Sequence, residues 1–210
     1  MSPDLDVLRL VLERSRTLGL LGPGPVDPHI THAEGFGVSA EDNLGRIPDS
    51  FADLGTGGGI PGLVLGMRWP AARGILVEAG QRRCIFLREA VSELGIGDHV
   101  EVIEDRAEVV ARSDDFREQF EVVTARSFAS PAITAEIGAG LVKVGGVLVV
   151  SEPPERDDRR WHAGEVQALG FSSVQVNERP GAHFAGFRKE SPVPTRYPRA
   201  VGRPAKRPLW

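Results

Sequence analysis

The side chains most suited to binding chemistry begin at a glycine-rich segment, Asp53-Leu54-Gly55-Thr56-Gly57-Gly58-Gly59-Ile60-Pro61-Gly62. Glycines have no Cβ, so the chain can turn sharply here and let a ligand approach its backbone. Glu78 follows nineteen residues after Gly59. A carboxylate at that distance from a glycine loop can accept hydrogen bonds from ribose hydroxyls. The spacing therefore predicts a site for a nucleoside-containing ligand.

Two classes of ligand match this loop. The glycines at 57, 59 and 62 fit the dinucleotide-binding pattern. Asp53-x-Gly55-x-Gly57-x-Gly59 is equally typical of the loop that binds S-adenosyl-L-methionine (SAM) in methyltransferases. Asp53 favours SAM, because its carboxylate repels a diphosphate but attracts the ammonium and sulfonium groups of SAM. No Lys-Ser or Lys-Thr follows the glycines, which excludes a nucleoside-triphosphate loop. A nicotinamide-dependent oxidoreductase remains the alternative.

Alternating strand and helix patterns must position this loop. Strands are expected at residues 50–54, 74–77, 100–104, 120–125 and 147–151, with helices between them at 61–67, 82–94, 107–112 and 131–141. Strands joined by single helices pair in parallel within one sheet. After a helix at 161–169, strands at 172–178 and 182–188 flank Arg179-Pro180-Gly181, which favours a hairpin. We therefore predict an α/β fold with a doubly wound, mostly parallel sheet and an antiparallel C-terminal strand.

Further segments lie on both sides of this sheet pattern. Apolar residues such as Leu5, Leu8 and Val11 recur at helical spacing, which predicts an amphipathic helix over 5–21, and a second helix is expected over 27–36. The chain is thus divided into a short N-terminal helical extension (1–46), a ligand-binding domain (47–190) and a basic, proline-rich C-terminal tail (191–210).

The composition narrows the class of protein. The chain has 210 residues, of which 41% are hydrophobic and 26% charged, as in a globular domain. Cys84 is its single cysteine, which excludes a disulfide framework and a multi-thiolate metal site. No apolar run reaches the ~18 residues of a membrane span. We expect a cytoplasmic, monomeric protein with no membrane contact.

From about Phe51 onward the chain resembles the ribosomal small-subunit RNA methyltransferase G family. The resemblance rests on the order and spacing of DLGTGGGIPG (53–62), RRCIFLREA (82–90), DRAE (105–108), TARSFA (124–129) and RYPR…PAKRP (196–208). It implies the class I SAM-methyltransferase fold, which is Rossmann-like. It also implies that a methyl group is transferred from SAM to N7 of a guanine in 16S rRNA, either free or within the small ribosomal particle.

The resemblance also assigns site residues by position. Gly55 and Ile60 would line the cofactor site, Ala107 and Glu108 would lie against the adenine, and Arg126 would contact cofactor or substrate. With the loop residues, the expected cofactor-binding set is Asp53, Gly55, Gly57, Gly59, Ile60, Glu78, Ala107, Glu108 and Arg126.

The chemistry implied by the resemblance makes modest demands. Guanine N7 has a free lone pair and no proton to lose, so the enzyme needs no general base and works by positioning. We expect Arg126 and Phe128 to be the catalytic residues. Arg126 would position a substrate phosphate or the cofactor carboxylate, and Phe128 would stack on the extruded base. The alternatives are a surface ion pair for Arg126 and a core position for Phe128.

The C-terminal segment is a candidate for RNA contact. Residues 188–210 contain seven Lys or Arg against one acid, so this segment has a net charge of +6. The whole chain has a net charge of −4, so the remaining residues together have −10. The alternative is a solubilising extension without a partner. Arg106 matches an arginine that recurs in the family. The expected RNA-binding set is Arg106, Arg196, Arg199, Arg203, Lys206 and Arg207.

Three segments depart from the family pattern. Ser151-Glu152-Pro153-Pro154 stands where many members have a lysine, and Ala182-His183-Phe184 where they have an arginine. The N-terminal region is shorter and reads His29-Ile30-Thr31-His32-Ala33. These differences leave open a SAM-dependent methyltransferase that acts on another RNA or a small molecule, and a non-catalytic RNA-binding protein. His29 and His32 have no third ligand nearby, so no metal site is predicted.

Overall fold

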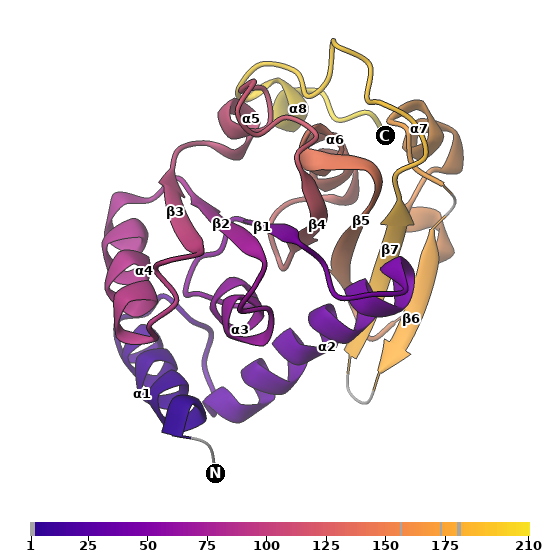
Figure 1. Cartoon of the computed structure of the whole chain (residues 1–210). Helices are drawn as coiled ribbons and strands as arrows, with labels where there is room; N and C mark the ends of the chain where they lie inside the picture. Colours follow the sequence, from indigo (N-terminus) through magenta and orange to yellow (C-terminus); the bar gives the residue numbers. More distant parts are fainter. Residues whose placement is uncertain (1–2, 156, 173, 180–181) are drawn as a thin grey trace.

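A computed structural model describes residues 3–155, 157–172, 174–179 and 182–210. Its sheet has seven strands in the order β3-β2-β1-β4-β5-β7-β6 (Figure 1). The strands are β1 (Ser50–Leu54), β2 (Arg73–Glu78), β3 (Val100–Glu104), β4 (Phe120–Ala125), β5 (Val142–Glu152), β6 (Gln175–Arg179) and β7 (Ala182–Arg188). The helices are α1 (Pro3–Thr17), α2 (Val26–Leu44), α3 (Gly62–Arg68), α4 (Gln81–Glu93), α5 (Ala107–Val110), α6 (Pro131–Leu141), η1 (Asp158–Arg160), α7 (Ala163–Ala168) and α8 (Arg203–Lys206).

Strands β1 to β5 pair in parallel, and β7 runs antiparallel to both β5 and β6. The expected antiparallel strand at 182–188 is therefore confirmed, with Val150 of β5 opposite Ala185. Pro180 and Gly181 of the expected hairpin turn lie outside the described residues. The order of the strands reverses between β1 and β4, which is where open α/β sheets bind their ligands.

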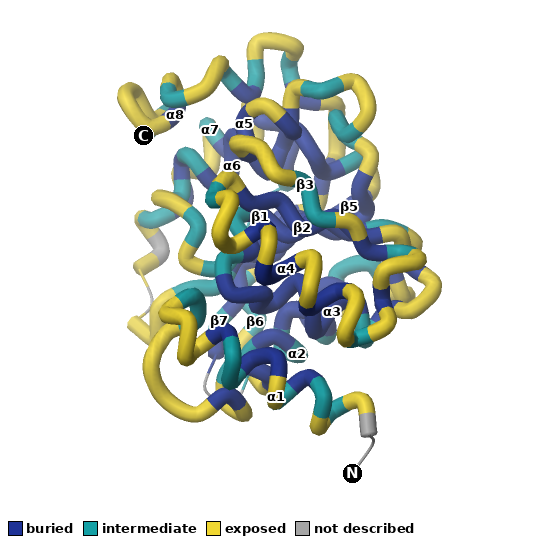
Figure 2. The backbone as a smooth tube through the Cα atoms, turned by 90° about the vertical axis from the view of Figure 1, so that its left-hand side faces the viewer, coloured by how far each residue is buried: buried dark blue, intermediate teal, exposed yellow. Residues whose placement is uncertain are grey.

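Each face of the sheet is covered by helices. In β1, Phe51 packs in a core with residues of α2, α3 and α4, whereas Ala52 and Leu54 pack in a core with residues of α5, α6 and α7. This alternation follows from the opposite directions of successive side chains in a strand. Figure 2 shows the central strands buried, with exposed residues on the outer turns of the helices and in the loops. No helix in the described ranges is long and apolar enough to cross a membrane.

Helix α2 is longer than the expected 27–36 and packs against β5, β7 and α3. The glycines at 35 and 37 explain the underestimate. A Cβ at Gly35 would lie 2.7 Å from the ring of Phe184, and a Cβ at Gly37 would lie 2.6 Å from Nε of Arg68, so both glycines permit close packing and do not end the helix. The helix instead ends at Gly45, whose φ of +74° is the left-handed conformation common at helix C-termini. Helix α2 therefore packs directly onto the sheet, and α1 packs against α2 and α4.

Candidate active site

The glycine loop leaves β1 as predicted and leads into α3. Gly55, Gly57 and Gly59 have φ values of +63°, +59° and +102°, which residues with a Cβ rarely adopt. At Gly55 a Cβ would lie 2.6 Å from Cδ2 of Phe128, and at Gly59 a Cβ would lie 2.4 Å from Cδ1 of Leu63. Glycine is thus required both by the backbone conformation and by close packing.

The buried carboxylate of Asp53 stabilises the conformation of this loop. It is fully buried, and its Oδ1 accepts a hydrogen bond of 2.7 Å from Oγ1 of Thr124, while its Oδ2 accepts one of 3.0 Å from the amide of Gly62. Burial raises the pKa of Asp53 to about 6, and these hydrogen bonds offset only part of that effect. Asp53 therefore fixes the shape of the loop through Thr124 and Gly62, and its expected contact with SAM stays a prediction.

Glu78, at the end of β2, faces a cavity beside the loop. Its Oε2 accepts a hydrogen bond of 3.1 Å from the amide of Gly57, and its Oε1 accepts one of 2.8 Å from the amide of Gly80. Arg83 lies 3.6 Å from Oε1. Backbone amides therefore hold the carboxylate in one orientation, and each oxygen retains a lone pair for a ligand.

The first cavity has a volume of about 310 Å³, within the range of small-molecule sites. Its wall combines polar groups at the strand ends with apolar residues of α5 and α6, among them Gly55, Glu78, Ala107, Glu108, Phe128 and Ile133. A carboxylate for a ribose, apolar surfaces for a flat base and glycines for close backbone approach fit a nucleoside such as that of SAM. We call this the nucleoside cavity. Gly57, Gly59 and Ile60 are not part of its wall; Ile60 is buried against Val64.

Glu108 connects the nucleoside cavity to the C-terminal tail. Its Oε1 accepts hydrogen bonds of 3.2 Å from Arg106 and from the amide of Gly202. Burial acts to raise the pKa of Glu108, but hydrogen bonds that include these two outweigh it and lower the pKa. Ala205 of the tail lines the cavity. Arg106, expected to bind RNA, lines the same cavity and pairs with Glu108.

The tail runs beside α5 and α6, with α8 next to both (Figure 1). Arg199 anchors it, because its amide, Nε and Nη2 donate hydrogen bonds of 2.8, 2.8 and 2.5 Å to the fully buried carboxylate of Glu136. Arg199 therefore pairs with Glu136 inside the protein, and its expected contact with RNA stays a prediction. The other four basic residues expected in the RNA-binding set are exposed on the tail: Arg196, Arg203, Lys206 and Arg207.

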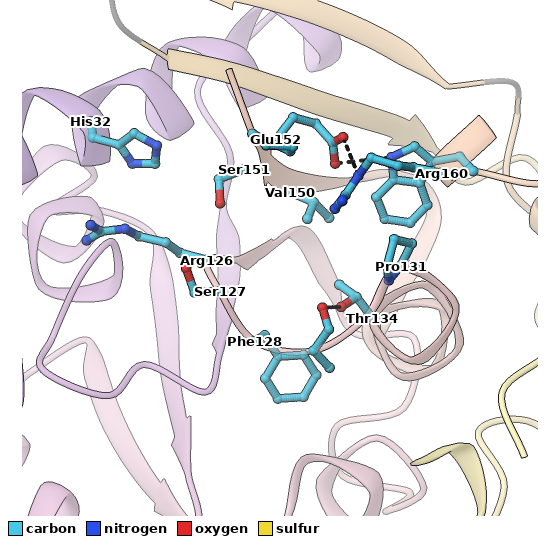
Figure 3. A pocket seen from close by; sticks show the side chains of 13 residues that line it. His32, Arg126, Ser127, Phe128, Pro131, Thr134, Val150, Ser151, Glu152 and Arg160 are labelled. Carbon is cyan, nitrogen blue, oxygen red and sulfur yellow. Dashed lines mark hydrogen bonds and ion pairs between the residues drawn. The ribbon is translucent and has the colours of Figure 1, made fainter. Parts of the chain in front are cut away.

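A second cavity of about 430 Å³ adjoins the first and has Ser127, Phe128 and Ala129 in its wall as well (Figure 3). We call it the acceptor cavity. Ser127 has a φ of +51°, an uncommon conformation for a residue with a Cβ. Figure 3 shows Arg126 and His32 on one side of this cavity and Glu152 and Arg160 on the other.

Arg126, at the end of β4, points toward α2. Its Nη2 lies 2.8 Å from Nδ1 of His29, and since arginine can only donate, this nitrogen of His29 accepts. Burial lowers the pKa of Arg126, and the charge of Asp53 opposes that effect. Burial, together with the charge of Arg126, lowers the pKa of His29 and lowers that of His32 to about 4. The two histidines are therefore neutral near pH 7 and belong to the site.

The sequence predicts no metal site at His29 and His32 and assigns neither of them to the cofactor or the substrate. Their three-residue spacing was the available signal, but only the packing of α2 against the sheet brings them to Arg126. Within the described part of the chain, no group of three or more His, Cys, Asp or Glu could hold a metal ion. Phe128 lines both cavities, and its ring lies against Gly55.

The strand order, the glycine loop and the nucleoside cavity at the switch point define a class I methyltransferase fold. Solved structures agree. An O-methyltransferase from Bacillus cereus in complex with SAH has a TM-score of 0.62 at 15% identity, covering 88% of this chain and 91% of that one. An RNA methyltransferase from Salinibacter ruber in complex with S-adenosyl-L-homocysteine has a TM-score of 0.53 at 18% identity, covering 82% and 97%.

The family follows from the sequence matches. The family model described as rRNA small subunit methyltransferase G matches residues 37–179. Relatives named ribosomal RNA small subunit methyltransferase G are 38% identical over 171 residues in Roseiflexus castenholzii (79% of this chain, 73% of that protein) and 34% identical over 213 residues in Pelotomaculum thermopropionicum (95% and 87%). The chain belongs to the rRNA small subunit methyltransferase G family. The expected fold class, methyltransferase activity and cofactor, SAM, are thereby confirmed.

Proposed function

We propose that this protein methylates N7 of one guanine in the 16S rRNA of the small ribosomal subunit. The names of its relatives support the substrate class, and one structural observation carries the proposal. The nucleoside cavity and the acceptor cavity adjoin at Ser127, Phe128 and Ala129, so a cofactor in one and a base in the other would meet at that shared wall.

Residues of the chain would hold SAM and the guanine base in the geometry that methyl transfer needs. Glu78 would bind the ribose of SAM, and Ala107 and Ile133 would contact its adenine. Bound SAM supplies an electrophilic methyl group on its sulfonium. Because N7 carries no proton, the protein has only to align the base with that group and keep water out. Phe128, whose ring lies over Gly55, is the side chain placed to separate the cofactor from the solvent and to contact the base.

Arg126 would act in the acceptor cavity. Its hydrogen bond to His29 fixes the direction of the guanidinium, which leaves further N–H groups for a phosphate of the substrate RNA or for the carboxylate of the cofactor. Turnover of Arg126→Ala should therefore fall strongly while the fold persists. Arg126→Lys retains the charge and loses the planar set of donors, so it should restore only part of the activity.

The RNA would bind along the exposed basic residues of the tail, in particular Arg203, Lys206 and Arg207, beside the nucleoside cavity. The rest of the chain is acidic overall, so free RNA should bind weakly and a structured ribosomal particle should be the better substrate. We further propose that the protein acts as a cytoplasmic monomer.

A different acceptor is the second candidate. The segment Ser151 to Pro153, which departs from the family pattern, lines the acceptor cavity. A cavity with different side chains in its wall could bind another RNA or a small molecule as the methyl acceptor.

Nucleoside mass spectrometry of 16S rRNA separates these candidates. RNA from a deletion strain should lack one 7-methylguanosine, and the wild-type gene should restore it, whereas Arg126→Ala should not. A complete set of 7-methylguanosines in the deletion strain would rule out the proposed substrate.

A further inference from the structure

Glu152 is a carboxylate in the wall of the acceptor cavity that the proposed function has not yet used. It ends β5, and its side chain is 10% exposed. Nε of Arg160 donates a hydrogen bond of 2.9 Å to its Oε2, and the indole Nε1 of Trp161 donates one of 3.1 Å to its Oε1. Figure 3 shows Glu152 and Arg160 across the cavity from Arg126.

Two neighbours therefore fix the orientation of this carboxylate. Each oxygen has one donor inside the protein and retains a lone pair. Trp161 is held in turn, because its ring packs edge-on against Phe187 at 4.5 Å between centroids. A preorganised carboxylate of this kind loses little entropy when a ligand binds, and it can only accept hydrogen bonds.

The bases differ in what they offer to such a group. On its Watson–Crick edge guanine presents two adjacent donors, N1–H and the exocyclic N2 amine. Adenine presents an acceptor at N1, which a carboxylate repels. Enzymes that act on an extruded base read it through this edge and through stacking. We infer that Glu152 selects guanine in the acceptor cavity by accepting hydrogen bonds from N1–H and N2–H₂.

This inference rests on the proposed function, because it assumes that the acceptor is a guanine. With the Watson–Crick edge held by Glu152, the opposite edge of the base, which contains N7, is left free for the reaction. Arg160 and Trp161, which also line the cavity, then act as positioning residues through their hydrogen bonds to the carboxylate.

Inosine provides the test, because it retains N1–H and N7 but has no exocyclic amine. Small-subunit particles are reconstituted with guanosine or inosine at the nucleotide that loses its methyl group in the deletion strain, located by mass spectrometry of RNA fragments. For the wild type, kcat/KM should be about tenfold or more lower on the inosine particle, as expected when one oxygen of a buried carboxylate loses its partner. In Glu152→Gln the guanosine rate should fall, and the ratio between the two particles should approach one.

Glu155→Gln is the matched control, because Glu155 is an exposed acid in the same segment and is not part of the cavity wall. It should retain the wild-type ratio. If Glu152→Gln also retained the full preference for guanosine, Glu152 would only hold Arg160 and Trp161 in place, and the inference would be overturned. A wild type inactive on the guanosine particle would instead refute the proposed function itself, and the inference with it.

Discussion

The carboxylate of Glu108 accepts a hydrogen bond of 3.2 Å from the amide of Gly202, which joins the wall of the nucleoside cavity to the C-terminal tail. Arg199, three residues before Gly202, donates two side-chain hydrogen bonds to Glu136 on α6. The tail is therefore held at two places around the cavity, and Ala205 between its exposed basic residues completes the wall. A segment that is basic in sequence thus forms part of the wall of the nucleoside cavity.

Arg199→Ala should accordingly weaken cofactor binding as well as stability. It leaves the buried carboxylate of Glu136 without its cation, a loss that typically costs about 3–5 kcal/mol. Calorimetry with S-adenosylhomocysteine should show an affinity at least tenfold lower, because the tail no longer closes the cavity. Arg207→Ala, on the same segment but exposed, should leave both the melting temperature and this affinity unchanged. Wild-type affinity in Arg199→Ala would mean that the tail plays no part in the cofactor site.

Glu78→Gln should lower affinity for S-adenosylhomocysteine, and it should also lower the melting temperature, because the amide of Gly57 or Gly80 loses its acceptor. Its carboxylate faces the nucleoside cavity, and an amide can accept through only one of its two ends. A loss of about ten- to a hundredfold in affinity is expected, from one or two hydrogen bonds to a charged group. Glu104→Gln is the control, since Glu104 ends β3 directly opposite Glu78 but is exposed and not part of the cavity wall. Equal losses in both variants would contradict the assignment.

Asp53→Ala should destabilise the protein itself. The substitution leaves two buried donors, the hydroxyl of Thr124 and the amide of Gly62, without their acceptor, and each such group costs about 1–3 kcal/mol. The melting temperature should fall, and cofactor affinity should fall with it because the loop loses its support. Thermal unfolding and calorimetry measure the two effects. Lower affinity with an unchanged melting temperature would show that Asp53 contacts the cofactor directly.

Local patterns predicted much of this structure. The bounds of β1, β3, β4, β7 and α6 agree with the expected ranges, because short apolar runs are there bounded by clear turn or helix-start residues. The glycine loop and Glu78 lie at the ends of β1 and β2 as expected, and Gly55 and Glu78 line the same cavity, while their contact with a ligand stays a prediction. Helix α2 was underestimated because its glycines serve packing and not chain reversal.

Long-range contacts account for what the sequence could not indicate. The positive charge of Arg199 is visible in the sequence, but its partner, Glu136, lies on a helix 63 residues away. The same holds for His29, whose contact with Arg126 spans 97 residues. Asp53 was assigned to the cofactor from its position in a motif, while its depth below the loop depends on the packing of β1 between β2 and β4.

The free energy of unfolding should depend on pH through His32. Its pKa in the folded protein is lowered to about 4 from an ordinary 6.5, by burial first and then by the charges of Arg126 and His29. Between these values the unfolded chain binds a proton that the folded chain does not, so stability is lost as the pH falls from about 6.5 toward 4. His32→Phe should make this fall shallower in melting curves at pH 7 and 5.

Other groups titrate in the same window, so the comparison between variants is decisive. Asp53, with a folded pKa raised to about 6, contributes in the opposite direction, and it does so in both proteins. His162→Phe, which replaces an exposed histidine, is the control for the loss of an imidazole elsewhere in the chain. An unchanged dependence in His32→Phe would show that the ring is readily protonated in the folded protein.

RNA binding should depend on salt through the exposed part of the tail. If Arg196, Arg203, Lys206 and Arg207 each neutralise one phosphate, their removal should make the slope of log affinity against log salt concentration less steep by about 3. Anisotropy measurements on small-subunit particles over a salt series give this slope for the wild type and for the variant with all four changed to alanine. Arg73→Ala, at the opposite end of the sheet, removes an exposed cation far from the cavities and should leave the slope unchanged. An identical slope in the fourfold variant would remove the tail from RNA binding and leave it the single role of closing the nucleoside cavity.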